Sequence, residues 1–178
     1  MPTANIRLTP EALAMTQPSF AHRRPAVALL LCVLLVFAIA SLGAIAPPGE
    51  WYAGLRKPWF NPPAWVFGPA WTTLYLMIAT ATWLLWRAPA SAARTRALRL
   101  NAVQLALNAA WTPLFFGLKL PGVAFVGIVL MWVFIAATIR AAWPVRRAAA
   151  WLLVPYLAWV SFAATLNGSL WWLNRAAG

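Results

Sequence analysis

Residues 51–75 read WYAGLRKPWFNPPAWVFGPAWTTLY, and aromatic residues alternate with prolines over the first two-thirds of this stretch. Pro58, Pro62 and Pro63 have no amide hydrogen and favour an extended chain in the residues before them, so no helix is expected before residue 63. Flexible linkers are rich in glycine, serine or charge, whereas this segment is apolar and stiff. We therefore expect it to form a lid over a cavity in the apolar remainder of the chain.

The composition of that remainder indicates a membrane protein. Of the 178 residues, 63% are hydrophobic and 9% are charged, whereas soluble domains contain about 25% charged residues. Thirteen tryptophans suit the interfacial belts of a membrane protein. The net charge of +12 also occurs in nucleic-acid-binding proteins, but those gather basic residues on a polar face. Here the basic residues lie in short breaks between apolar runs, so the bilayer is an expected partner and nucleic acid is not.

The apolar runs predict an all-α integral membrane protein, a five-transmembrane-helix bundle. A span needs about 20 residues, and the connections are short, so sequence neighbours should be antiparallel. The first run also resembles a signal peptide with cleavage after Ala44-Ile45-Ala46, although it exceeds the usual length of about 7–15 apolar residues. The five predicted helices cover residues 25–46, 64–86, 98–118, 123–143 and 148–173.

This pattern divides the chain into three parts. Residues 1–25 are predicted to be a polar, largely disordered tail, and residues 174–178 a short C-terminal tail. Residues 26–173 are predicted to form one five-helix membrane domain, in which the aromatic, proline-rich lid loop covers residues 47–63.

The basic residues predict the orientation of this domain. Cytoplasmic loops carry an excess of lysine and arginine. This rule places the N-terminus in the cytoplasm and the lid outside, in a multi-pass protein that we expect in a bacterial cell membrane. Ten basic residues fall on the side of the N-terminus and four on the side of the lid: Arg7, Arg23, Arg24, Arg87, Arg94, Arg96, Arg99, Arg140, Arg146 and Arg147 against Arg56, Lys57, Lys119 and Arg175.

Polar residues on two predicted helices identify the faces that point into the bundle. Gln104, Asn108 and Trp111 occur at i, i+4 and i+7 of the third helix and so share one face. Amides in hydrocarbon are costly unless they are hydrogen-bonded, which directs this face inward. The amides then either line a ligand cavity or link helices to one another.

The fifth predicted helix carries a second stripe of this kind. Tyr156, Trp159, Ala163 and Asn167 occur at i, i+3, i+7 and i+11, and the small Ala163 leaves space between its larger neighbours. An apolar cavity with a few polar groups is typical of a small-molecule site. Close helix packing at Ala163 is the alternative interpretation.

Residues for acid–base or metal chemistry are scarce in the apolar runs. Glu50 is the only acid near the lid, His22 lies in the tail, and Cys32 is the single cysteine. An ordinary hydrolase or metalloenzyme is therefore not expected, and no catalytic residue or metal ligand is assigned. The abundant indole and phenyl rings suit a large, flat, apolar ligand, which they bind by stacking and area burial.

Three long motifs give the chain its resemblance to a known family. They are the stretch at residues 51–75, NAAWTPLFFG at residues 108–117 and PYLAWVSFAATLN at residues 155–167. With them, residues 26–173 resemble the TspO/MBR family, the tryptophan-rich sensory proteins related to the mitochondrial translocator protein (peripheral benzodiazepine receptor). The resemblance implies a five-helix membrane bundle, often dimeric. It also implies a pocket beneath the first loop that binds porphyrins such as protoporphyrin IX, haem-like tetrapyrroles and, in some members, sterols or synthetic drug ligands.

Matching positions imply a ligand-binding site and a homodimer, with no obligatory cofactor beyond such a porphyrin or haem-type ligand. One departure concerns sterols: Gly168-Ser169-Leu170-Trp171-Trp172 follow Asn167, without the central tyrosine of the sterol-recognition pattern in animal members. Nine residues would form the site: Trp59, Phe60, Asn108, Trp111, Tyr156, Trp159, Ala163, Leu166 and Asn167.

Three functions remain open at this point. The first is a membrane receptor or sensor with a regulatory role in tetrapyrrole or stress responses. The second is a carrier of such ligands across the membrane, for which prolines 69, 113 and 155 give only a weak signal because no clear repeat accompanies them. The third is a porphyrin-degrading activity that depends on light and oxygen.

Overall fold

The computed structural model describes residues 20–175, and all the regular elements assigned in that range are helical. The predicted disorder of the N-terminal tail concerns mainly residues 1–19, which lie outside the described residues, as do residues 176–178 of the C-terminal tail. The elements are α2 (Phe20–Arg23), α3 (Pro25–Ser41), the 3₁₀-helix η1 (Leu42–Ile45), α4 (Glu50–Gly54), α5 (Ala64–Arg87), α6 (Ala92–Thr112), the π-helix η2 (Pro113–Gly117), α7 (Pro121–Ala142) and α8 (Arg147–Asn174).

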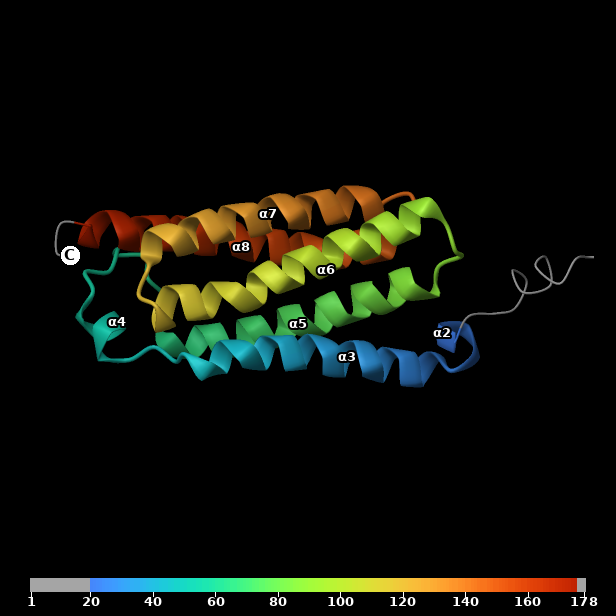
Figure 1. The fold of residues 1–178 in the computed structure, drawn as a ribbon, viewed down its shortest axis with the longest axis horizontal. Coiled ribbons are helices and arrows are strands. Elements are labelled where there is room, and N and C mark those ends of the chain that lie inside the picture. Colours follow the sequence, from blue (N-terminus) through green and yellow to red (C-terminus); the bar gives the residue numbers. More distant parts are fainter. Residues whose placement is uncertain (1–19, 176–178) are drawn as a thin grey trace, which may run out of the picture.

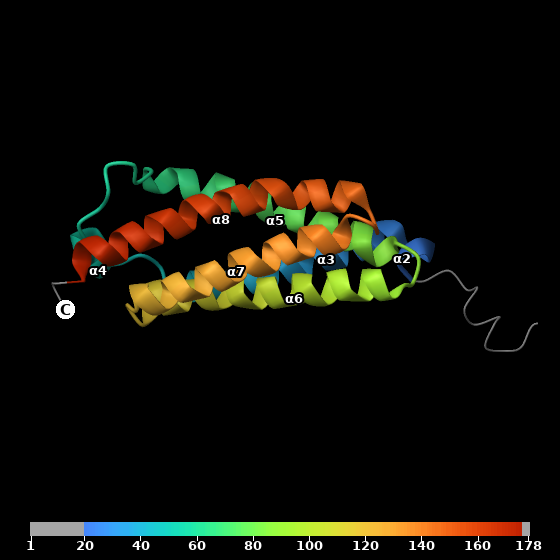
Figure 2. The same cartoon turned by 90° about the horizontal axis from the view of Figure 1, so that it is seen from above.

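The five long helices run side by side in one bundle (Figure 1). Helices α6 and α7, α7 and α8, α3 and α5, and α5 and α8 pack against each other. Seen from above, α5 and α8 lie on one side of the bundle, and α6 and α7 lie on the other (Figure 2). The segment that contains α4 lies at one end, beside the end of α8, whereas α2 lies at the opposite end.

Three of the predicted helices agree with the structure within two residues at each end, namely α5, α7 and α8. The first predicted helix is too long, because regular α-helix ends at Ser41 and a 3₁₀ turn follows. These bounds leave open how many of the helices cross a bilayer.

The third predicted helix begins too late and ends too late. Helix α6 begins at Ala92, because the Ser91 hydroxyl accepts a hydrogen bond from the Arg94 amide at 3.2 Å and caps the first turn. Its regular turns end at Thr112, because Pro113 has no N–H to donate to the preceding turn, and a π-helix continues the chain. The basic segment before residue 98 therefore belongs to the helix and not to a loop.

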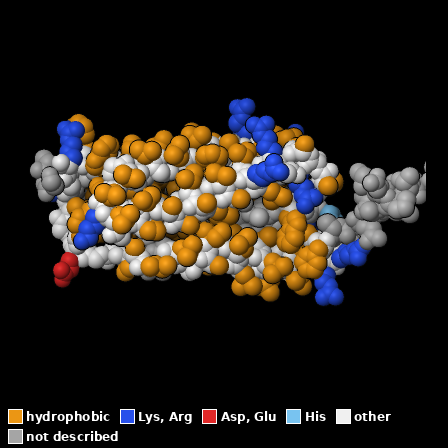
Figure 3. Space-filling view, viewed as in Figure 1, with side chains coloured by type: hydrophobic (Ala, Val, Ile, Leu, Met, Phe, Trp, Pro, Cys, Tyr) orange, Lys and Arg blue, Asp and Glu red, His pale blue; other side chains and the backbone are white. Residues whose placement is uncertain are grey.

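The surface of the bundle suits a membrane. Hydrophobic side chains cover the middle of the visible face, whereas lysine and arginine side chains gather toward its two ends (Figure 3). Leu30, Leu34, Val126 and Val133 are each at least half exposed on α3 and α7. Helices α7 and α8 are long and apolar enough to cross a membrane, and α3 is a shorter apolar helix. Exposed apolar surface of this extent favours contact with lipid over contact with water.

Two glycines allow α7 and α8 to pack closely. A Cβ atom at Gly168 would lie 3.0 Å from Cε2 of Phe125, and one at Gly122 would lie 3.0 Å from the indole of Trp171. We expect Gly168→Leu to lower the free energy of unfolding by about 1–3 kcal/mol through overpacking. Thermal unfolding in detergent would measure this loss. Gly54→Leu is the control, since nothing lies within 4 Å of a Cβ there, and equal losses in both variants would contradict the packing argument.

Candidate ligand-binding site

The lid is held in shape by its own side chains. The Tyr52 hydroxyl donates to Oδ1 of Asn61 at 3.1 Å, and Nδ2 of Asn61 donates to the Pro62 carbonyl at 3.0 Å. Partial burial raises the pKa of the Tyr52 hydroxyl, which keeps this donor protonated at neutral pH. Nζ of Lys57 donates to the Ala53 carbonyl at 2.9 Å and lies 4.9 Å from the Tyr52 ring centroid. The lid is thus an ordered segment and not a loose linker.

A single side chain fastens the lid to the end of α8. The Arg56 amide donates to Oδ1 of Asn174 at 2.9 Å, and Nδ2 of Asn174 donates back to the Arg56 carbonyl at 3.0 Å. Nδ2 also donates to the Leu170 carbonyl at 2.8 Å within α8. The Asn174 amide therefore pairs with both backbone groups of one lid residue.

We expect Asn174→Ala to speed amide hydrogen exchange in the lid, because it removes both of these hydrogen bonds, each of which contributes about 0.5–1.5 kcal/mol. Exchange at residues 55–57, followed by mass spectrometry, is the measurement, and an increase of about tenfold is expected. Asn174→Asp keeps the acceptor and loses the donor, so an intermediate rate is expected. Identical rates in all three proteins would show that Asn174 does not hold the lid.

Aromatic rings fill the space directly under the lid. The Trp51 and Tyr52 rings meet the Phe115 ring edge-on, with centroids 5.8 and 6.3 Å apart. Phe115 is 1% exposed, and its ring stacks on that of Trp111 at 5.1 Å with an interplanar angle of 21°. The Phe116 ring packs against Tyr52 at 5.3 Å. The Phe115 ring thus lies between the lid and the indole of Trp111.

Trp111 is fixed by a hydrogen-bonded link between three helices. Its Nε1 donates to Oδ1 of Asn167 on α8 at 3.0 Å, and Nδ2 of Asn167 donates to the Pro121 carbonyl at the start of α7 at 2.9 Å. Leu166, also buried, packs in the same apolar cluster as Phe115. Three of the nine predicted site residues, Trp111, Leu166 and Asn167, are therefore gathered beneath the lid.

Deeper in the bundle, Tyr156 is the centre of a buried polar network. Its hydroxyl donates to Oε1 of Gln104 at 2.9 Å and accepts from Nδ2 of Asn108 at 3.1 Å. The Tyr75 hydroxyl donates to Oδ1 of Asn108 at 3.1 Å. Gln104, Asn108 and Tyr156 are all buried, so the third and fifth helices turn their polar faces inward as the spacing indicates. The amides link α5, α6 and α8, which is the interhelical role that the sequence left open.

A second group of rings connects the lid to α8. The Phe60 ring meets Phe162 with centroids 6.3 Å apart, and Phe162 packs against Trp159 at 5.7 Å. The Phe67 ring of α5 meets Trp159 edge-on at 6.1 Å. Ala163 is partly buried and packs against the central core. Phe60 and Trp159 are thus joined through Phe162.

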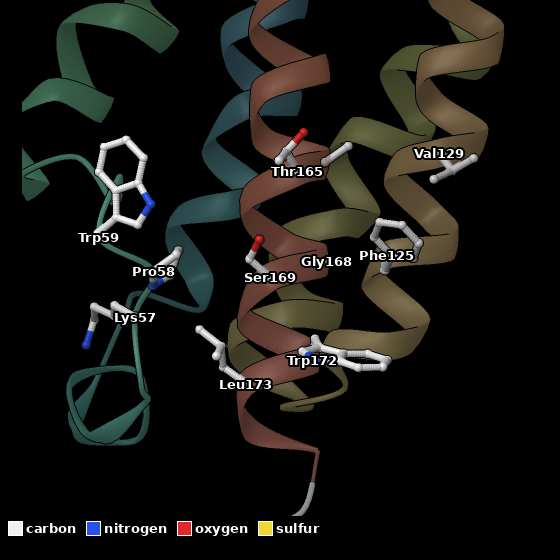
Figure 4. A pocket seen from close by; sticks show the side chains of 11 residues that line it. Lys57, Pro58, Trp59, Phe125, Val129, Thr165, Gly168, Ser169, Trp172 and Leu173 are labelled. Carbon is white, nitrogen blue, oxygen red and sulfur yellow. The ribbon is translucent and has the colours of Figure 1, made fainter.

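Trp59 takes a different position from the other predicted site residues. It is 96% exposed and contributes to a hollow of about 780 Å³ on the outer face of α7 and α8, opposite Gly168 and beside Lys57. Figure 4 shows its ring beside α8, with Phe125 across the helix. The structure therefore separates Trp59 from the rings under the lid.

Sequence reasoning did not single out several residues around this site. Phe115 follows Trp111 by four positions, so helical spacing places both on one face. The two phenylalanines of the NAAWTPLFFG motif could have been assigned on that basis. Tyr52, Phe67 and Phe162 were left out as well, and no spacing rule connects them to the other residues, because their contacts join separate helices and the lid.

Comparison with known proteins follows from this geometry. The model of the TspO/MBR family matches residues 28–173. The chain is 43% identical over 135 residues to the tryptophan-rich sensory protein of Cereibacter sphaeroides, covering 76% of this chain and 84% of that one. It is 42% identical over 153 residues to the translocator protein of Sus scrofa, covering 85% and 90%. It is 41% identical over 153 residues to the tryptophan-rich protein TspO of Chlorobaculum tepidum, covering 82% and 95%.

Proposed function

The chain belongs to the TspO/MBR family, and from this premise we propose that it is a membrane receptor or sensor that binds porphyrins beneath its aromatic lid. Relatives named as sensory and translocator proteins support a membrane receptor or regulatory role. The ligands would be protoporphyrin IX and haem-like tetrapyrroles, with sterol-like or drug molecules as further candidates. The regulatory role would lie in tetrapyrrole or stress responses.

The observation that carries this proposal is the stack of rings between the lid and α6. Phe115 lies against Trp111 in a parallel arrangement at 5.1 Å, and a flat tetrapyrrole would make the same kind of contact with the indole. The ligand would take the place of the Phe115 ring, so the lid would have to lift. Asn167, bonded to Trp111, would fix the indole plane while this happens.

The placement in the membrane is also proposed. Helices α3, α5, α6, α7 and α8 would each cross the bilayer, with the N-terminus in the cytoplasm and the lid outside. Nine of the described basic residues lie toward the α2 end of these helices, against four at the lid end, as the positive-inside rule requires. A homodimer would form through a helix face with small residues, for which Ala102 and Ala106 of α6 are candidates.

Titration with protoporphyrin IX, followed by quenching of tryptophan fluorescence, tests the proposal. We expect Trp111→Ala and Trp159→Ala each to weaken binding about tenfold, equivalent to about 1.4 kcal/mol. Trp151→Ala is the matched control, since this exposed tryptophan lies on α8 near the end opposite the lid, and its affinity should match that of the wild type. Equal affinities in all four proteins would refute a porphyrin site beneath the lid.

A further inference from the structure

A second hollow lies between α5 and α8, outside the cluster under the lid. Its volume is about 730 Å³, within the range of about 300–1,000 Å³ that small-molecule sites occupy. Among the described residues that line it, none is charged. Several lining residues are exposed on the outer face of the bundle, which opens the hollow sideways to the surrounding medium. The rings and prolines of its wall are Trp65, Pro69, Pro155, Trp159 and Phe162.

One polar atom in this wall is unsatisfied. Nε1 of Trp159 is buried and has no hydrogen-bond partner in the described part of the chain. By contrast, the indole of Trp111 donates to Asn167, that of Trp132 to Ser161 and that of Trp83 to the Pro25 carbonyl. A buried donor without a partner costs about 1–3 kcal/mol. The exception at Trp159 therefore calls for an acceptor from outside the chain.

The lining itself offers Trp159 little that could satisfy it. Thr73 is the lining side chain that carries oxygen, and its hydroxyl is already turned to its own helix, where it donates to the Pro69 carbonyl at 2.9 Å. The rest of the lining side chains are aliphatic, aromatic or proline, apart from the Met77 thioether, a weak acceptor. A suitable occupant is neutral, largely apolar and flat enough to pack against rings, and it carries an oxygen acceptor.

We propose that the hollow between α5 and α8 binds the ring of a membrane-dissolved quinone, one carbonyl of which accepts a hydrogen bond from Nε1 of Trp159. A quinone carbonyl is an acceptor only, so it complements an unpaired donor. The flat ring stacks against Trp159 and Phe162, and the absence of charge in the described lining matches a neutral molecule. The sideways opening lets the ring enter from the bilayer, without movement of the lid.

A matched pair of probes tests this proposal: 2-methyl-1,4-naphthoquinone and 2-methylnaphthalene, which has the same ring system without carbonyl groups. Binding is measured by equilibrium dialysis with the full-length protein in lipid nanodiscs. Trp159→Phe keeps an aromatic ring and removes the N–H. We expect this variant to bind the naphthoquinone about tenfold more weakly than the wild type and to bind the hydrocarbon equally. Trp172→Phe, in the hollow on the outer face of α7 and α8, should leave both affinities unchanged.

Infrared spectroscopy gives a second readout. The carbonyl stretch of the bound naphthoquinone should lie at lower wavenumber in the wild type than in Trp159→Phe. Ala158→Phe fills the hollow from α8 and should abolish binding of both probes while the protein keeps its helical circular dichroism. Equal naphthoquinone affinities in wild type and Trp159→Phe would overturn the proposal, as would a carbonyl stretch that does not change. Because Trp111 lies outside this hollow, loss of protoporphyrin IX binding in Trp111→Ala reports separately on the site under the lid.

Discussion

Tyr156→Phe is expected to lower the free energy of unfolding by about 2–3 kcal/mol, although the substitution removes only one oxygen atom. Tyr156 is fully buried, and its hydroxyl serves both Gln104 and Asn108. Without it, an amide oxygen and an amide N–H lose their partners in an apolar interior. Each such loss costs about 1–3 kcal/mol, and values in membranes lie toward the lower end because the unfolded helices find other partners.

The matched control is Tyr52→Phe in the lid. Its hydroxyl makes one hydrogen bond, to Asn61, at a half-exposed position where water can replace it. We expect this variant to lose less than 1 kcal/mol. Both proteins would be unfolded by sodium dodecyl sulfate in mixed micelles, with circular dichroism as the readout. If the two tyrosines lose the same amount, the buried network does not stabilise the bundle.

A double-mutant cycle with Gln104→Leu separates the network from simple packing. If the Tyr156 hydroxyl and the Gln104 amide stabilise each other, the double variant should lose less than the sum of the single losses, by about 0.5–3 kcal/mol. Asn101 must be considered in the comparison, because it accepts a hydrogen bond from Gln104 at 3.0 Å. Strict additivity would mean that the two side chains act independently.

These residues also show what could be predicted from sequence. Helical spacing placed Gln104, Asn108 and Trp111 on one inward face, because an amide in an apolar helix must find a partner. Spacing along one helix does not determine which residue on another helix supplies that partner. The bonds to Tyr156 and Asn167 depend on how α6 and α8 are rotated against each other, and that rotation results from the packing of the whole bundle. The family resemblance was confirmed by the comparisons.

The lid and the start of α6 mark the limits of the sequence argument. Prolines 58, 62 and 63 predicted a non-helical chain, but they do not determine which side a ring takes, and Trp59 faces the outer surface. Helix α6 starts earlier than expected because arginines before residue 98 resemble a loop by charge, whereas the capping hydroxyl of Ser91 sets the first turn. A local hydrogen bond here outweighs the pattern of charge.

Phe115→Ala should have the largest effect on stability of the substitutions considered. The ring is 1% exposed and is surrounded by Trp51, Tyr52, Trp111 and Phe116, so its removal leaves a cavity under the lid. Truncation of a buried phenylalanine to alanine costs about 3–5 kcal/mol. The unfolding midpoint in mixed micelles would measure the loss. Phe20→Ala is the control, because its half-exposed ring packs on Trp86 at the opposite end of the bundle.

The same variant should bind protoporphyrin IX more tightly than the wild type. If the ligand takes the place of the Phe115 ring, the wild type must expel that ring before the tetrapyrrole can stack on Trp111, and the variant need not. An affinity gain of about tenfold corresponds to only 1.4 kcal/mol, which is a fraction of the packing energy of the ring. The ligand should therefore raise the melting temperature of Phe115→Ala by more than it raises that of the wild type. An equal or smaller rise would show that the ligand and the Phe115 ring do not compete for one place, and would leave the space under the lid as a packed joint between α6 and the lid.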